Sequence, residues 1–177
     1  MTKKRFITIS CSFLLLLSVV AVATLSLQKP SKAHAAGEGT SSITGPGVSF
    51  TDTEYPSCFG IGPDTTCIVN QEFVYDLDRI PDSASAANYA TALDSGTLSY
   101  DAFYREVAFS QEATNDFSAL YQGCLGRPIS ASELAFRQTA LYNHTRDLFG
   151  QAIDILQSSE AQSHGSLCKL QFSGYGV

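Results

Sequence analysis

The sequence predicts an all-α protein in which two tandem three-helix repeats pack as one compact domain. Two observations indicate this: a repeat of about 48 residues, and apolar residues at helical spacing without convincing apolar–polar alternation. When residues 73–113 are shifted by 48 positions without a gap, ten of the 41 positions carry identical residues. The identical residues of the first copy are Leu77, Arg79, Ala87, Thr91, Ala92, Leu93, Thr97, Ser110, Glu112 and Ala113.

The N-terminal residues 1–35 are expected to be a signal peptide. Three basic residues within the first five precede an apolar stretch, and a small-x-small pattern ends at Ala35. We expect cleavage between Ala35 and Ala36. An uncleaved membrane anchor is the alternative, because about 20 apolar residues are enough to span a bilayer.

The charge of the mature chain excludes one class of partner. Six of the 11 Lys and Arg residues and all 17 acidic residues follow Ala35, which gives a formal charge of −11. Nucleic-acid binding needs clustered basic side chains, so this class is excluded. We expect an extracytoplasmic protein, secreted or at the cell surface, whose only membrane contact is the signal segment if it is uncleaved.

The mature chain divides by composition. A segment rich in Gly, Ser, Thr and Pro is expected to be a flexible spacer, followed by a loop that contains two cysteines. The predicted parts are the spacer 36–56, the cysteine loop 57–69, repeat one at 69–113, repeat two at 117–161 and a tail at 162–177.

The first helix of each repeat carries an apolar stripe and ends at a residue tolerated in the left-handed conformation. That residue is Asp78 in the first copy and Gly126 in the second. The stripes are Val69, Phe73 and Leu77 in the first copy, and Phe117, Leu120, Tyr121, Cys124 and Leu125 in the second.

The second and third helices of each repeat follow N-cap residues. Asp82 caps the second helix of the first copy, and Ser130 with Glu133 forms a capping box in the second. Ser99 caps the third helix of the first copy. The turn before the third helix contains Gly96 in one copy and His144 in the other, and we expect this histidine to be solvent-exposed.

Four cysteines follow the expected cleavage site, and an even number in an exported chain indicates disulfides. We expect Cys58 to pair with Cys67 because they close a short loop. Cys124 and Cys168 then pair by elimination and fix the tail. A zinc site is the alternative, but the chain has no Cys-x-x-Cys spacing.

The motifs Leu125-Gly126-Arg127 and Ser158-x-Glu160 resemble those of a bacterial helical repeat domain of unknown function, found in secreted and surface-layer-associated proteins. That family is similar to the helical repeat of phycobilisome linkers. The chain departs from the pattern in two ways: it has no tryptophan in the second helix, and Asp78 replaces the glycine in the first copy. The resemblance implies two helical copies and no specific activity.

The charged residues shared by the two copies are interpreted as structural. We expect Arg79 to pair with Glu112 and Arg127 with Glu160, since each pair recurs at the same offset. The arginines end the first helix, where a cation complements the C-terminal dipole, and the glutamates are expected to end the third. The nearest candidate for a calcium site is the acidic run Asp76, Asp78 and Asp82.

No catalytic motif, cofactor site or metal site is predicted from the sequence, which lacks the common nucleophile, zinc and phosphate-loop patterns. We expect a non-catalytic helical module that mediates interaction with a protein or a cell-envelope polymer. The alternative is an extracytoplasmic enzyme or accessory domain that acts on carbohydrate or cell wall, which would need two carboxylates across a cleft.

Overall fold

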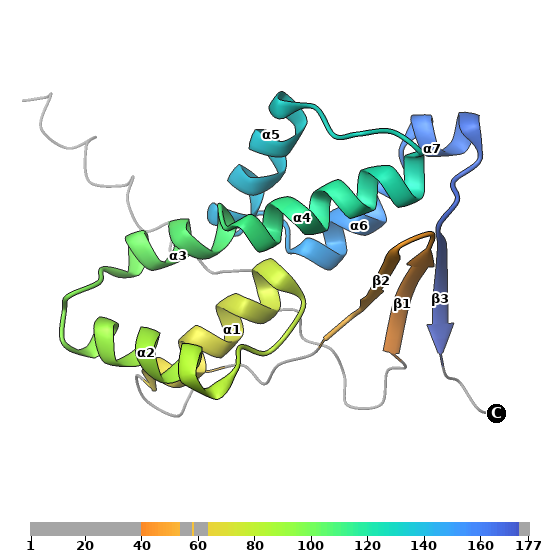
Figure 1. The fold of residues 1–177 in the computed structure, drawn as a ribbon. Coiled ribbons are helices and arrows are strands. Elements are labelled where there is room, and N and C mark those ends of the chain that lie inside the picture. Colours follow the sequence, from red (N-terminus) through yellow and green to blue (C-terminus); the bar gives the residue numbers. More distant parts are fainter. Residues whose placement is uncertain (1–39, 54–57, 59–63, 174–177) are drawn as a thin grey trace, which may run out of the picture. The chain divides into compact units, whose positions relative to one another are not determined.

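A computed structural model describes residues 40–53, 58 and 64–173. The expected signal peptide and its cleavage site lie outside these residues. The described chain is mostly helical and also contains three short strands, shown in Figure 1. In chain order the elements are β1 (Thr40–Gly45), β2 (Val48–Thr51), α1 (Thr65–Leu77), α2 (Ser83–Asp94), α3 (Tyr100–Ala108), α4 (Gln111–Leu120), the π-helix η1 (Tyr121–Leu125), α5 (Ala131–Tyr142), α6 (Leu148–Leu156), α7 (Ser159–His164) and β3 (Lys169–Ser173).

The all-α prediction was wrong, because the three strands form an antiparallel sheet in the order β2-β1-β3. Residues 40–51 therefore belong to a hairpin and not to a flexible spacer, and part of the expected tail is β3. Two residues connect the hairpin. Pro46 fixes its own φ, and Gly47 takes φ +69°, the left-handed value that a type II turn requires at its second central residue.

The helices of the two predicted copies have matching boundaries. Helix α5 begins and ends 48 residues after α2, and α6 begins and ends 48 residues after α3. The left-handed residues also correspond: Asp78 (φ 52°) with Gly126 (φ 71°), and Gly96 (φ 69°) with His144 (φ 51°). We call residues 69–113 the first segment and residues 117–161 the second segment, and we call positions 48 apart equivalent.

The third helix of each copy ends earlier than expected. Helix α3 ends at Ala108 and α6 at Leu156, and in both cases a serine then caps a new helix. Ser110 accepts a hydrogen bond from the backbone N–H of Ala113, as Ser158 does from Ala161. Glu112 and Glu160 therefore lie in the first turn of the following helix, where a carboxylate is favoured by the dipole.

One apolar core joins the helices to the sheet. Helix α1 packs against α2, α3, α4, α5 and α6, and Ile43 and Val48 add the sheet to the same cluster. The largest fully buried apolar side chains are Ile43, Val69, Phe103, Phe117, Leu120, Leu141, Leu148 and Ile155.

The sheet lies very close to η1. A Cβ atom on Gly123 would lie 2.5 Å from the carbonyl oxygen of Pro46 and 2.3 Å from Cγ2 of Val48. The second disulfide, Cys124–Cys168, links η1 to the residue just before β3, and Cys58–Cys67 also forms, so both predicted pairings are confirmed. Helix α1 begins at Thr65, so Cys67 lies in a helix and not in a loop.

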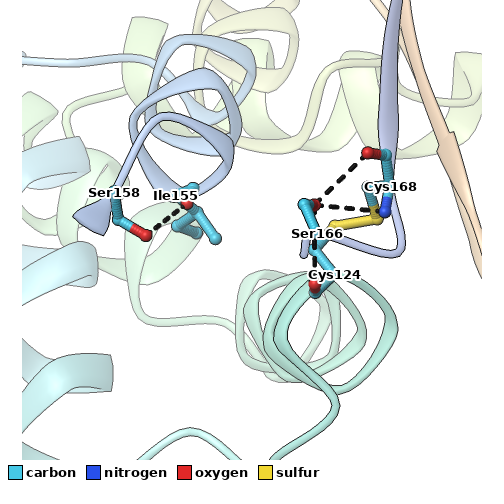
Figure 2. Close-up of a disulfide and its surroundings, with 5 residues drawn as sticks. All are labelled: Cys124, Ile155, Ser158, Ser166 and Cys168. Carbon is cyan, nitrogen blue, oxygen red and sulfur yellow. Dashed lines mark hydrogen bonds between the residues drawn. A yellow bond between two sulfur atoms is a disulfide. The ribbon is translucent and has the colours of Figure 1, made fainter. Parts of the chain in front are cut away.

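Hydrogen bonds support the Cys124–Cys168 link (Figure 2). The hydroxyl of Ser166 donates to the carbonyl oxygens of Cys124 and Cys168 and accepts from the N–H of Cys168. The N–H of Leu167 donates to the same Cys124 carbonyl at 3.1 Å. The Cys124 carbonyl, near the end of η1, is thus satisfied by the chain leading into β3.

The substitution Gly123→Ala should lower the free energy of unfolding by about 1–3 kcal/mol, because the added methyl group would overlap a backbone carbonyl that cannot rotate away. Urea denaturation measures the change. The same substitution in a Val48→Ala background is the control and should recover only part of the loss, since the Pro46 contact remains. An unchanged unfolding midpoint would contradict this close packing.

Candidate functional site

Two arginine–glutamate pairs hold equivalent positions. Nε of Arg79 lies 2.5 Å from Oε1 of Glu112 and its Nη2 lies 2.6 Å from Oε2. The corresponding distances from Arg127 to Glu160 are 2.5 and 2.7 Å. Both predicted pairs are confirmed, and both have the two-point geometry that a guanidinium forms with a carboxylate.

Each arginine also rests on an aromatic ring. The Arg79 guanidinium lies 5.3 Å from the ring centre of Phe73, and that of Arg127 lies 5.0 Å from Tyr121, the equivalent residue. The ring fixes one face of the guanidinium while the glutamate fixes one edge. The two guanidinium groups are therefore held in the same orientation in both segments.

The two arginines differ in their further partners. Arg127 also binds Glu133, through Nη1–Oε2 at 3.1 Å and Nη2–Oε1 at 2.7 Å. This arginine and Ser130 hold the pKa of Glu133 at about 2. The equivalent of Glu133 is Ser85, whose hydroxyl donates to Asp82 at 2.6 Å. Among the described residues, Arg79 is thus hydrogen-bonded to one carboxylate, that of Glu112, where Arg127 is hydrogen-bonded to two.

A groove of about 660 Å³ opens beside Arg79, between α1, α2, α3 and the start of α4, and we call it the Arg79 groove. Its apolar lining includes Phe73, Leu77 and Val107. Four charged residues line it as well: Arg79, Arg105, Glu106 and Glu112. The lining thus combines apolar surface with charged groups of both signs.

The rim of the groove combines aromatic and charged side chains. Arg105 lies over the rings of Phe109, at 5.9 Å, and Tyr142, at 4.9 Å, and the Phe109 side chain is 41% exposed. The hydroxyl of Tyr89 donates to Glu106 at 2.9 Å. Burial, together with this carboxylate, raises the pKa of Tyr89 to about 12.

In the second segment, a cavity of about 140 Å³ is lined by Leu125 and Glu160 among others. Leu77 and Glu112, their equivalents, line the Arg79 groove. Leucine and glutamate of the shared motifs therefore line a cavity in each segment.

A buried glutamate contacts the histidine that was expected to be exposed. Nε2 of His144 lies 2.8 and 2.9 Å from the two carboxylate oxygens of Glu72, whose side chain is 2% exposed. The rings of Tyr75 and Tyr104 pack edge-on against the imidazole at 5.3 and 4.9 Å. The histidine side chain is 16% exposed, so the prediction of an exposed turn residue was wrong.

The positions equivalent to Glu72 and His144 hold an apolar residue and a small residue in the other segment. The equivalent of Glu72 is the buried Leu120, and the equivalent of His144 is Gly96. The signal in the sequence was an acidic residue three positions after Val69, on the apolar face of a predicted helix. A buried carboxylate needs a partner, because removal from water is costly.

The acidic run proposed as a calcium site does not gather around one point. Asp76 is fully buried in α1, while Asp82 caps α2 through the N–H groups of Ala84 and Ser85. Asp78 accepts a hydrogen bond from the N–H of Thr53 at 3.1 Å. Within the described part of the chain, no group of three or more His, Cys, Asp or Glu side chains could hold a metal ion.

Asp78 joins the end of α1 to the chain that leaves β2. Besides the bond to its carboxylate, the hydroxyl of Thr53 donates to the Asp78 carbonyl oxygen at 3.0 Å. Burial raises the pKa of Asp78 to about 7, against the opposing effect of the Thr53 hydrogen bond. The residue that departs from the Leu-Gly-Arg pattern thus makes a contact that glycine could not make.

No helix among the described residues combines the length and the apolar character that crossing a membrane requires. No family model, curated protein or solved structure matches the chain. Membership of the helical-repeat family therefore stays a prediction.

The substitution Asp78→Asn should stabilise the protein increasingly as the pH rises from about 4 to 8. The folded-state pKa of about 7 lies above the ordinary 3.8, so the folded state binds the proton more tightly, and this contribution to stability is lost as the pH rises through 7. Asparagine keeps the acceptor and tolerates the left-handed conformation. Thermal unfolding of both proteins across this pH range measures the difference.

Asp82→Asn is the matched control for that experiment. The Ser85 hydroxyl and the backbone N–H groups lower the pKa of Asp82 in the folded state, so the ionised carboxylate stabilises the fold and this stabilisation is lost as the pH falls. Asp82→Asn should therefore destabilise the protein by an amount that is constant above about pH 5 and that disappears at lower pH. A constant difference between Asp78→Asn and the unsubstituted protein over the whole range would contradict the raised pKa.

Replacing Glu72 and His144 together should cost far less than replacing either alone. His144→Gly should lower the free energy of unfolding by about 3–5 kcal/mol, because it leaves a buried carboxylate without its partner. The double variant Glu72→Leu with His144→Gly, which copies the equivalent residues, should lie within about 1 kcal/mol of the unsubstituted protein. Urea denaturation of the four proteins gives the coupling, and additive costs would refute it.

Proposed function

We propose that this protein is an exported, disulfide-stabilised helical module that binds a protein or a polymer of the cell envelope through the Arg79 groove. The observation that carries the proposal is the groove itself. It opens beside Arg79, and in the second segment Glu133 is hydrogen-bonded to the equivalent arginine from the position that Ser85 holds in the first.

The composition of the groove supports binding. Phe73, Leu77 and Val107 offer apolar surface, and Phe109 is partly exposed next to Arg105. Aromatic and arginine side chains are enriched among the residues that contribute most to binding at interfaces. The rings and the Glu112 carboxylate hold the two arginines in place, so less conformational entropy is lost when a partner binds.

Export is proposed from the N-terminal pattern and from the two disulfides. Disulfides persist in oxidising compartments and are rare in the reducing cytosol. Cleavage before Ala36 would release a chain of formal charge −11, which favours solubility. We further propose that the two segments are copies of one ancestral helical unit, which the matching boundaries and ion pairs support.

The test is a pull-down from the envelope fraction of the producing cells, with the exported, oxidised protein as bait. The double variant Arg105→Ser with Phe109→Ser should lose the captured partner, since it removes the exposed rim of the groove. Phe136→Ser is the matched control, because Phe136 is 67% exposed on α5 and does not line the groove. The control should capture as much partner as the unsubstituted protein.

Two results would contradict the proposal. One is equal capture by the groove variant and the unsubstituted protein, which would place binding elsewhere on the surface. The other is loss of capture by Phe136→Ser alone. Circular dichroism of each variant establishes that a loss of capture is not a loss of fold.

A further inference from the structure

The second segment shows how this arginine site holds two carboxylates. In that segment Glu160 occupies one edge of the Arg127 guanidinium, and Glu133 occupies the next edge through Nη1 and Nη2. The same Nη1 also donates to the carbonyl of Pro128 at 3.2 Å. The guanidinium thus binds both carboxylates at hydrogen-bond distance.

In the first segment the same guanidinium holds one carboxylate. Arg79 binds Glu112 and donates to the carbonyl of Ile80 at 3.2 Å, the equivalent of the Pro128 contact. Among the described residues, Glu112 is its only ion-pair partner. Ser85 occupies the position of Glu133, and both Arg79 and Ser85 line the Arg79 groove. The edge that Glu133 covers in the second segment therefore opens onto the groove.

We propose that the Arg79 groove binds an acidic peptide segment, whose Asp or Glu carboxylate docks on Arg79 as the Glu133 carboxylate docks on Arg127. A neighbouring apolar side chain of that segment packs on Phe73, Leu77 and Val107. This inference rests on the proposed function and specifies the chemistry of the partner. The apolar lining favours a peptide over an anionic polysaccharide, which carries few apolar groups.

Most charged groups of the groove are already engaged by other side chains. Glu112 is engaged by Arg79, and Glu106 accepts from Tyr89, while Arg105 faces aromatic rings. The hydrogen bond to Glu112 raises the pKa of Arg79 most, and the charges of Asp82 and Asp116 raise it further and so add negative potential near it. The net charge of the whole chain is screened over about 8 Å at physiological salt, so contacts within the groove decide the binding.

The experiment is a titration of the exported, oxidised protein, labelled with ¹⁵N, with the tripeptide acetyl-Glu-Leu-Phe-amide. Its comparison peptide, acetyl-Gln-Leu-Phe-amide, has the same shape without the charge. The first peptide should shift the Nε–H resonance of Arg79 and the amide resonances of the groove in a saturable way. The glutamine peptide should bind about tenfold more weakly, because hydrogen bonds to charged groups are stronger.

Ser85→Glu closes the proposed site from within. This variant recreates the residue of the second segment, so it should bind the glutamate peptide about tenfold more weakly and unfold at a higher temperature. Ala87→Glu is the matched control, because it adds the same charge at an exposed position of the same helix. The control should bind as the unsubstituted protein does, and circular dichroism verifies that both variants fold.

The outcomes separate this inference from the proposed function. Equal binding of the two peptides at the groove would overturn carboxylate docking and leave the proposed function standing. Undiminished binding by folded Ser85→Glu would also overturn it. Groove shifts produced by polygalacturonate and not by the glutamate peptide would replace the peptide by an anionic polymer. No shift with any probe would overturn the inference, while the pull-down decides the proposed function separately.

Discussion

The pairing of Arg79 with Glu112, and of Arg127 with Glu160, sets the geometry on which the rest of the described structure depends. Each pair joins the residue that follows a left-handed helix stop to the first turn of a helix 33 residues later. Because the side chains are one-third to two-fifths exposed, each pair adds little to the free energy of unfolding. Each pair instead fixes the position of its arginine over the aromatic ring, and the Arg79–Glu112 pair also fixes two side chains that line the groove.

The two segments share the same helix boundaries but differ in a few side chains. One difference gives a buried contact, and another changes the surroundings of the arginine that lines the groove. Glu72 and His144 form a buried contact between segments where the equivalents are Leu120 and Gly96. Ser85 leaves open the site that Glu133 fills beside the other arginine. The helix boundaries of the two segments match in spite of these different side chains, so the backbone does not depend on the residues that change.

Local patterns in the sequence predicted the parts of this structure that depend on neighbours along the chain. The caps at Asp82 and Ser130 and the left-handed stops are of this kind, and the fixed offset of the copies added the ion pairs. The sheet escaped prediction because β1 and β3 are short strands that pair across more than 120 residues. The burial of His144 escaped it for the same reason: a turn pattern contains no information about a distant Glu72.

The sheet holds the end of α1 in place beside the Arg79 groove. Asp78, at the end of α1, binds Thr53 beyond β2, and Cys124, in the equivalent stretch of η1, is bonded to Cys168 just before β3. Two equivalent helix ends are therefore tied to one sheet, by hydrogen bonds in one case and by a covalent bond in the other. Leu77 and Arg79 flank Asp78, which is hydrogen-bonded to Thr53, and both line the groove. These two residues would therefore already be in position when a partner binds, which reduces the entropy lost on binding.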